Sequence, residues 1–337
     1  MRRDDEGRSD DEPVGQTANP SSDGLNSTNN EAPPIQLLVR VGDNLPRVTP
    51  PGYAVATDLL AELLDGIDRP HAFAPPDRHT GLCRICGATA TLTFEHIPPS
   101  SAGNDRRARS SPGLPLLTSD QPLNFPKTGW TPAQRGVGGY VLCKPCNEFV
   151  GQRYILEYGQ LAAALRKQVD GAFAALGHAV GGLDLDLAGW ALGDVARAGL
   201  VTVMDVAVHD RLLRRYPELT NVVRQPGTPL PSTLRLGLTV VLGTRARLSS
   251  PVCQADPDGC VVFSEAALAP FSWTLSFLEP GLRSLPHTAD VSEWLHHGQN
   301  HRPIHAQLKL PVGAVVSPTP GDYRPASLIE ANLPTDR

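Results

Sequence analysis

The sequence predicts an α+β protein, in which a small cysteine-containing segment is followed by a larger domain with an antiparallel sheet. The first observation is a pair of Cys-x-x-Cys motifs, and the second is a run of helix-like segments that gives way to strand-like ones. Helices and strands that are segregated along a chain are typical of α+β domains. The helix-like segments are residues 160–175 and 188–216, and the strand-like segments are 233–243, 259–263, 271–278 and 304–311.

Composition divides the chain into five parts. Residues 1–34 are rich in Asp, Ser, Asn and Pro and have few apolar side chains to bury, so we expect a disordered acidic tail. This tail carries three arginines and eight acidic residues, and it therefore accounts for the whole net charge of −5. The other parts are a lead-in at 35–76 with a strand at 35–41 and a helix at 54–67, a zinc segment at 77–160, an α+β domain of unknown role at 161–325, and a tail at 326–337.

Hydropathy and the N-terminal residues indicate the compartment. The chain lacks any run of about 18 or more apolar residues, and no apolar stretch follows its first arginines. We therefore expect no transmembrane helix, no signal peptide and no membrane partner, and we predict a cytoplasmic location. Cysteines stay reduced there, so the six cysteines are interpreted as metal ligands and bystanders, and not as disulfides.

Four cysteines predict a structural zinc site. Each Cys-x-x-Cys turn points both sulfurs to one side, and Gly87 gives the first turn the backbone freedom that it needs. Four thiolates close a tetrahedral zinc site, which would hold together the ends of a long loop. The proposed ligands are Cys83, Cys86, Cys143 and Cys146. The alternative is two unrelated cysteine pairs.

Two strands and a helix are expected between and after these cysteines. Residues 91–95 alternate polar and apolar side chains, as a half-buried strand does, and a proline pair then ends the strand. A long insertion rich in Pro, Gly and Arg (100–137) precedes a second strand at 138–142. Pro145 suits the first turn of a helix.

Three polar residues form the candidate reactive group. Glu95 and His96 are adjacent at the end of a strand, so their side chains diverge, and one can bind a metal while the other faces a substrate. Glu95 and Asn147 offer oxygen ligands for a hard cation such as Mg²⁺, and a neutral His96 can remove a proton from water. Two alternatives stay open, namely a core histidine at position 96 and an asparagine that only caps its helix.

This order of strand, Glu-His-x-x-Pro, long loop, strand, Cys-x-x-Cys-Asn and helix resembles the HNH endonucleases of the ββα-metal fold, and more narrowly those with a cysteine pair on each side. The resemblance covers residues 80–160. It implies that His96 is the general base, that Glu95 and Asn147 bind a catalytic divalent metal, and that the four cysteines bind structural zinc. The implied reaction is hydrolysis of phosphodiester bonds, most often in DNA.

Two positions depart from the family pattern. Many members carry Asn or His shortly before the second Cys-x-x-Cys, where this chain has Gly138. Asn104, Asp105 and Asn124 in the insertion are candidates for this middle residue. A basic residue often follows Cys-x-x-Cys-Asn, and Glu148 stands there instead.

Basic residues around the motif favour a nucleic-acid partner. Residues 78–155 carry nine Lys or Arg against four acidic residues, and such a surface suits a polyanion. The alternative is an ordinary solvated loop. The residues proposed to contact nucleic acid are Lys144, Arg153, Arg106 and Arg107.

Two groups of residues in the C-terminal part are also candidates for a metal site. Three histidines are spaced by four, as on a metal-binding helix, but a glycine and a proline among them argue against a continuous helix. They are His297, His301 and His305. Cys253 and Cys260 flank a turn-forming sequence, which favours a hairpin over a zinc site.

These features together predict a metal-dependent endonuclease that acts on DNA, with structural Zn²⁺ and with Mg²⁺ or another divalent ion at the catalytic site. The alternative is a non-catalytic zinc module that binds nucleic acid or protein through a degenerate site. A third hypothesis gives the zinc domain a structural role in support of an unidentified activity in the C-terminal half. That half is larger than the zinc segment, and we expect it to recognise a target or to receive a protein or small-molecule trigger.

Overall fold

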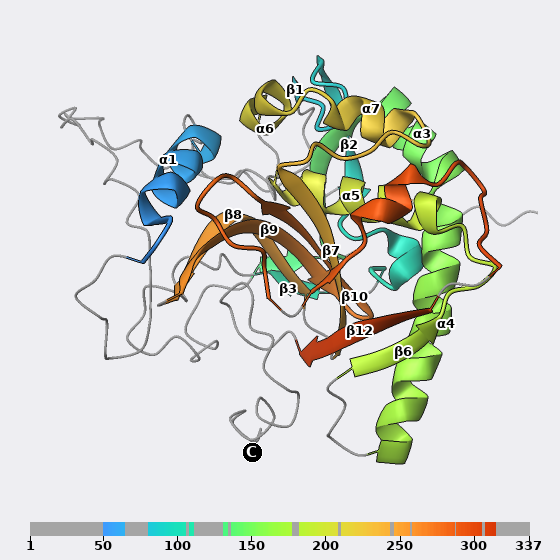
Figure 1. The fold of residues 1–337 in the computed structure, drawn as a ribbon. Coiled ribbons are helices and arrows are strands. Elements are labelled where there is room, and N and C mark those ends of the chain that lie inside the picture. The colour runs from blue at the N-terminus through green and yellow to red at the C-terminus, as the bar shows by residue number, and fades with distance from the viewer. Residues whose placement is uncertain are drawn as a thin grey trace, which may run out of the picture. The chain divides into compact units, whose positions relative to one another are not determined.

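The computed structural model describes the chain in segments between residues 50 and 314. They are residues 50–64, 80–105, 108–110, 131–133, 136–176, 182–207, 210–242, 246–256, 258–286, 288–304 and 307–314. The predictions for the two tails, for a strand at 35–41 and for Arg106, Arg107, Asn124 and His305 lie outside these segments. The described part combines helices with mainly antiparallel sheets, which confirms the α+β class (Figure 1). No helix within the segments is long and apolar enough to cross a membrane.

The zinc segment, together with the lead-in before it, contains a helix, a three-stranded sheet and a second helix. They are α1 (Tyr53–Leu64), β1 (Thr80–Leu82), β2 (Thr89–His96), β5 (Gly138–Cys143) and α3 (Lys144–Arg153). The sheet is antiparallel with the order β1-β2-β5, and the first cysteine turn joins β1 to β2. α3 follows β5 without a loop, and Pro145 lies in its first turn. Proline is tolerated there because the first N–H groups of a helix have no partner within the helix, so the N–H that proline lacks is not needed. Both expected strands and the expected helix start are therefore present.

The insertion between β2 and β5 contains a short 3₁₀ helix and a separate strand pair. They are η2 (Ser100–Ala102), β3 (Ala108–Ser110) and β4 (Thr131–Ala133). η2 packs against the long helix α4 (Ile155–Leu176), and a Cβ atom at Gly159 of α4 would lie 2.6 Å from the Ser101 Cβ. Gly159 lowers helix propensity, but its lack of a side chain lets η2 approach the helix.

The C-terminal part begins with helices and ends with most of the strands. The first elements are β6 (Gly182–Asp186), α5 (Leu192–Ala207), α6 (Asp210–Arg215) and α7 (Leu219–Arg224). The later elements are β7 (Leu234–Leu242), β8 (Ala246–Asp256), β9 (Gly259–Leu268), β10 (Phe271–Phe277), β11 (Ala289–Asp290), η4 (Ser292–His296) and β12 (Gln307–Ala314). A seven-stranded sheet has the order β6-β12-β7-β10-β9-β8, with β11 paired to β7. Its pairings are antiparallel except for β12 with β7.

Strand β10 illustrates how the two faces of this sheet differ. Phe271, Trp273 and Leu275 alternate with the hydroxyl residues Ser272 and Thr274, and all five are buried. The apolar face packs against helices. A Cβ atom at Gly199 of α5 would meet the Trp273 ring at 2.4 Å, and the Trp273 Nε1–H donates to the Tyr158 hydroxyl of α4 at 3.0 Å. Helices α4 and α5 are thereby fixed against the sheet.

Six described strands were not predicted, namely the short β1, β3, β4 and β11 and the longer β6 and β8. β8 has an irregular register between Ser249 and Val252, and it contains Pro251. A bulge breaks the alternation on which strand prediction depends, and proline is tolerated because β8 lies at the edge of the sheet. The hairpin expected at Cys253 and Cys260 is present, since β8 and β9 pair up to the turn.

One hydrophobic cluster runs through both parts of the chain. It includes Ile85 of the first cysteine turn, Val150 of α3, Leu200 of α5 and Trp273 of β10. Helix α4 also runs across residue 160 without a break. The boundary predicted at that position stays a prediction, and the described residues on its two sides share a core.

Candidate functional site

The four predicted zinc ligands lie together. Their Sγ atoms are all within 4.8 Å of one another, and three of the cysteines are buried while Cys86 is part-buried. Cys83 and Cys86 come from the turn between β1 and β2, where the Gly87 N–H donates to the Cys83 carbonyl at 2.9 Å. Gly87 has a φ of 69°, a left-handed conformation that glycine adopts without strain. Four sulfurs at this separation can bind a metal ion such as zinc.

The thiols interact strongly with one another. A hydrogen bond from Cys146 lowers the pKa of Cys83 to about 4, whereas the interaction with Cys83 and burial raise the pKa of Cys146. One thiolate thus forms readily, and each further negative charge is unfavourable without a cation. A bound Zn²⁺ would supply that positive charge, as expected of a structural tetrathiolate site.

Helix α7 contacts both cysteine turns, which the sequence did not predict. The Arg224 Nη2 donates to the Cys146 Sγ at 2.9 Å, and the Thr220 hydroxyl donates to the Ile85 carbonyl at 2.6 Å. The Tyr154 hydroxyl after α3 also donates to the Val223 carbonyl of α7 at 2.7 Å, and Figure 1 shows α7 beside α3. The C-terminal part therefore contacts the four-cysteine group from outside it. No local sequence signal marks these contacts, because they join residues 69–135 positions apart.

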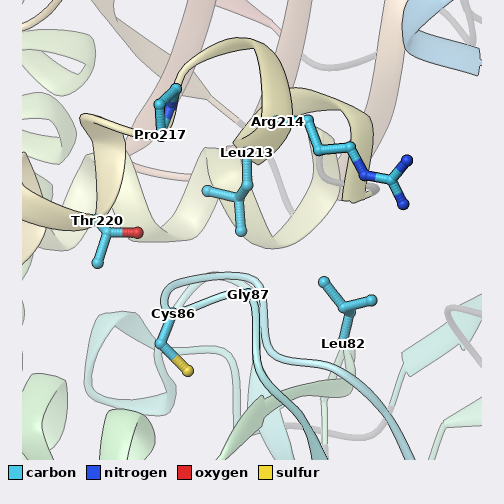
Figure 2. A pocket seen from close by; sticks show the side chains of 7 residues that line it. All are labelled: Leu82, Cys86, Gly87, Leu213, Arg214, Pro217 and Thr220. Carbon is cyan, nitrogen blue, oxygen red and sulfur yellow. The ribbon is translucent and has the colours of Figure 1, made fainter.

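A shallow cavity of about 320 Å³ opens beside the first cysteine turn. Figure 2 shows its lining residues, which are Leu82, Cys86, Gly87, Leu213, Arg214, Pro217 and Thr220. It lies between the cysteine turn and the α6–α7 region. Cys86 is the only part-exposed member of the four-cysteine group, and it borders this cavity. The cavity contains neither Glu95 nor His96, so it is distinct from the candidate reactive group.

Glu95 and Asn147 are brought together between β2 and α3. The Asn147 Nδ2 donates to the Thr93 hydroxyl of β2 at 3.0 Å. Burial raises the pKa of Glu95 to about 7, and a hydrogen bond from Asn147 partly offsets this increase. The residue at the N-cap of α3 is Cys143, and Asn147 faces β2 from the first turn. The capping interpretation of Asn147 therefore has no support in the geometry.

His96 lies on the other side of the strand. Its ring makes an edge-to-face contact with Phe94, with the ring centroids 5.3 Å apart, and its side chain is only part-buried. The prediction that the side chains of Glu95 and His96 diverge is consistent with this arrangement. His96 is therefore not a fully buried core histidine.

Asn104 holds the segment that follows His96. Its Nδ2 donates to the carbonyls of Pro98 and Val137, both at 2.6 Å, and its Oδ1 accepts from the Val137 N–H at 2.8 Å. Asn104 is 4% exposed, and its amide is used by the backbone. Of the three candidates for the middle residue, Asn104 therefore has a positioning role, and Asp105 is exposed.

The atoms around Gly138 explain why this position has no side chain. A Cβ atom there would lie 2.1 Å from the Glu95 carbonyl oxygen and 2.7 Å from the Phe94 ring. No side chain fits between β5 and the end of β2, so the middle residue of the family pattern has no room at this position.

The described candidates for nucleic-acid contact lie on α3. Lys144 is mostly exposed, and its Nζ is 3.7 Å from a carboxylate oxygen of Glu148. The Arg153 guanidinium lies over the Phe149 ring at 4.9 Å and donates to the Gln299 Oε1 at 2.8 Å. Arg153 thus links α3 to the segment after η4.

His297 and His301, the two described members of the histidine group, do not lie on a helix. η4 ends at His296, and the rings of His297 and His301 are 4.8 Å apart in the segment that follows. Arg197 of α5 holds this segment through the carbonyls of Leu295 and His297. Within the described part of the chain, the four cysteines form the only group of three or more Cys, His, Asp or Glu ligands close enough to share a metal ion.

Comparisons with models of protein families, with curated proteins and with solved structures gave no match for this chain.

Proposed function

We propose that residues 80–160 form a zinc-stapled HNH nuclease module, and that the chain is a metal-dependent endonuclease with DNA as its substrate. The observation that carries this proposal is the contact between Glu95 and Asn147 beside the four-cysteine site. Two antiparallel strands that lead directly into a helix are the framework that the ββα-metal family uses. Carboxylate and amide oxygens suit a hard divalent cation, so the residues fit the cofactor that the proposal requires.

Each residue in the proposed site has a separate role. His96 would accept a proton from the attacking water, and Glu95 with Asn147 would hold a divalent cation. When bound, Mg²⁺ would supply positive charge to the phosphoryl oxygen and to the departing alkoxide. Asn104 would keep the backbone after His96 in place. Carboxyl groups with a pKa raised to about 7 are common in functional sites. The burial that prepares such a group to bind a cation also favours its protonated form when no cation is bound.

The four cysteines and α7 support this site indirectly. Cys143 and Cys146 fix the start of α3, and Asn147 is the next residue. Zinc bound at the cysteines would therefore set the position of Asn147 relative to β2. Lys144 and Arg153 on α3 are the proposed phosphate contacts in this part of the chain.

A non-catalytic zinc module is the second candidate. The observation that favours it is the crowding at Gly138, which removes the middle residue of the family pattern, together with the pairing of Lys144 with Glu148. In that case the basic surface alone would bind nucleic acid or a protein. The C-terminal part is proposed to receive a trigger or a target in either case.

Cleavage of plasmid DNA and single-stranded DNA with Mg²⁺, Mn²⁺ or Ni²⁺ tests the proposal. We expect zinc-loaded wild type to nick plasmid, His96→Ala to lose at least about 100-fold in rate, and His301→Ala to retain it, since that exposed histidine lies in the segment after η4. Zinc content of each protein controls for folding. If zinc-loaded wild type binds DNA but never cleaves it, the non-catalytic module replaces the nuclease.

A further inference from the structure

Thr93 of β2 makes two hydrogen bonds through the single oxygen of its side chain. Its hydroxyl donates to the Leu142 carbonyl of β5 at 2.9 Å, and the same oxygen accepts from the Asn147 Nδ2 at 3.0 Å. A carbonyl oxygen only accepts hydrogen bonds, so the one hydroxyl proton of Thr93 is committed to Leu142. Toward Asn147, Thr93 therefore acts only as an acceptor.

This restriction decides which end of the Asn147 amide faces Thr93. The two ends differ in chemistry, because the amide nitrogen donates hydrogen bonds and the amide oxygen accepts them. An oxygen that can only accept selects the nitrogen. Asn147 is also the donor in its hydrogen bond to Glu95, since that bond lowers the pKa of the carboxyl. The Nδ2 is thus used by β2, and the amide oxygen is the atom left for a cation.

The backbone at Thr93 departs from regular pairing. The register of β2 with β5 shifts between Thr93 and Phe94, so that Val141 of β5 is the extra residue of a bulge. The Val141 carbonyl accepts instead from the Arg84 N–H of the first cysteine turn, at 3.0 Å. Bulges of this kind re-aim side chains and are common beside active sites. Thr93 therefore has a fixed place at the junction of β2, β5 and the cysteine turn.

We propose that Thr93 is the positioning residue of the cation site, and that its hydroxyl holds the Asn147 amide so that the oxygen, and not the nitrogen, faces the divalent ion. This inference rests on the proposed function, because it concerns the Asn147 ligand of the same site. The cysteines set where α3 begins and thus where the Asn147 backbone lies, whereas Thr93 sets the orientation of its side chain. An amide in the opposite orientation would direct its N–H groups at the cation, which binds only oxygen atoms here.

Binding of Mn²⁺ to the zinc-loaded full-length chain tests this inference without reference to catalysis. Thr93→Val keeps the branched shape but removes the hydroxyl, and Thr93→Ser keeps the hydroxyl. Thr91→Val is the matched control, because Thr91 is an exposed threonine of the same strand. We expect the Mn²⁺ dissociation constant to rise at least about tenfold in Thr93→Val, and to stay within about threefold of wild type in Thr93→Ser and Thr91→Val.

A double-mutant cycle with Asn147→Ala separates positioning from a general structural role. If Thr93 acts through the Asn147 amide, Thr93→Val should change Mn²⁺ affinity by less than about twofold once Asn147→Ala is present. A residue that merely supports the sheet would weaken binding by the same factor in both backgrounds, and this result would overturn the inference. Zinc content and thermal unfolding check that each protein is folded. If Thr93→Val loses zinc, Thr93→Ala takes its place in the cycle, since it brings no methyl group against the Leu142 carbonyl.

The outcomes separate this inference from the proposed function. If Asn147→Ala weakens Mn²⁺ binding but Thr93→Val binds like wild type, the inference fails and the proposed site stands. The inference also fails if Thr93→Ser or Thr91→Val weakens binding as much as Thr93→Val. If wild type does not bind Mn²⁺, or Asn147→Ala binds it equally well, both the inference and the proposed cation site are wrong.

Discussion

The corner where β5 turns into α3 contributes to two different sites, one with all of its ligands assembled and one without. Cys143 and Cys146 belong to the four-cysteine site, whose sulfurs already lie within 4.8 Å of one another. Asn147, the next residue, belongs to the proposed divalent site with Glu95, which brings together fewer groups and in which burial raises the pKa of the carboxyl. A structural site assembles itself from its cysteine spacing, whereas a catalytic site keeps positions open for water and substrate.

The difference also lies in what supports each site. The cysteine site receives a hydrogen bond from Arg224, and Thr220 fixes the first turn. Around the proposed divalent site, Asn104 holds the backbone that follows His96. The cysteine site is therefore supported by residues far away in the sequence, although it is recognisable without them.

The largest expected effect comes from removing one zinc ligand. Cys146→Ser should lose zinc and unfold the corner between β5 and α3, with a loss of at least about 5 kcal/mol of stability, because zinc binding is part of the folding free energy of such sites. Metal analysis and thermal unfolding measure both effects. Cys253→Ser is the control, since Cys253 lies on β8 outside the four-cysteine group. Equal losses in the two variants would contradict a special role for the cysteine site.

Asn104→Ala should have the next largest effect. The substitution removes three hydrogen bonds to buried backbone and should cost about 2–4 kcal/mol of unfolding free energy. Zinc should remain bound, because Asn104 does not contact a cysteine, while DNA cleavage should fall as the His96 segment loosens. Denaturant unfolding and zinc analysis are the measurements, and Asn221→Ala at an exposed position of α7 is the control. An unchanged stability would show that the Asn104 amide is not a positioning group.

The pH dependence of cation binding should separate the two sites. Glu95 has a pKa of about 7 in the folded protein, so a proton competes with the cation below that value, and the affinity for Mn²⁺ should fall by about tenfold per pH unit between pH 7 and pH 5. Zinc content followed at each pH shows whether the cysteine site is still intact. An affinity that does not change over this range would contradict the assignment of Glu95 as a ligand.

The raised pKa of Glu95 also predicts how the stability of the cation-free protein depends on pH. The pKa of Glu95 is raised on folding from an unfolded value of about 4.3, so protonated Glu95 stabilises the cation-free protein fully below about pH 4.3. This contribution is lost as the pH rises through about 7. Glu95→Gln should therefore flatten the decline of stability between pH 5 and pH 7, as measured by denaturant unfolding without divalent cations.

The smallest expected effect is on zinc affinity. Arg224→Met should remove the hydrogen bond to the Cys146 sulfur and weaken zinc binding by about tenfold, as outer-shell substitutions commonly do. Competition with a chelator measures the affinity. Arg153→Met is a matched control, because both guanidinium groups lie over the Phe149 ring but only Arg224 reaches a sulfur. Similar zinc affinities for wild type and Arg224→Met would mean that the cysteine site does not depend on α7.

The sequence allowed some of these features to be predicted and not others. Local patterns were sufficient for the four-cysteine group, for the strands around Glu95 and Gly138 and for the start of α3, because cysteine spacing, alternation and proline act over a few residues. They were insufficient for β8, whose irregular register breaks the alternation, and for β6. Arg224 and Thr220 carried no signal at all, since their partners are more than 70 residues away in the chain.

The central claim is that one ion maintains the fold and another enables the chemistry. The most direct test is plasmid cleavage by the full-length chain, first with Mn²⁺ present, then after its removal, and then after its return, with zinc content measured at each stage. We expect cleavage to stop and to resume with Mn²⁺ while zinc and the folded state stay unchanged. Cleavage that continues without Mn²⁺, or a zinc-loaded chain that never cleaves DNA, would contradict the claim.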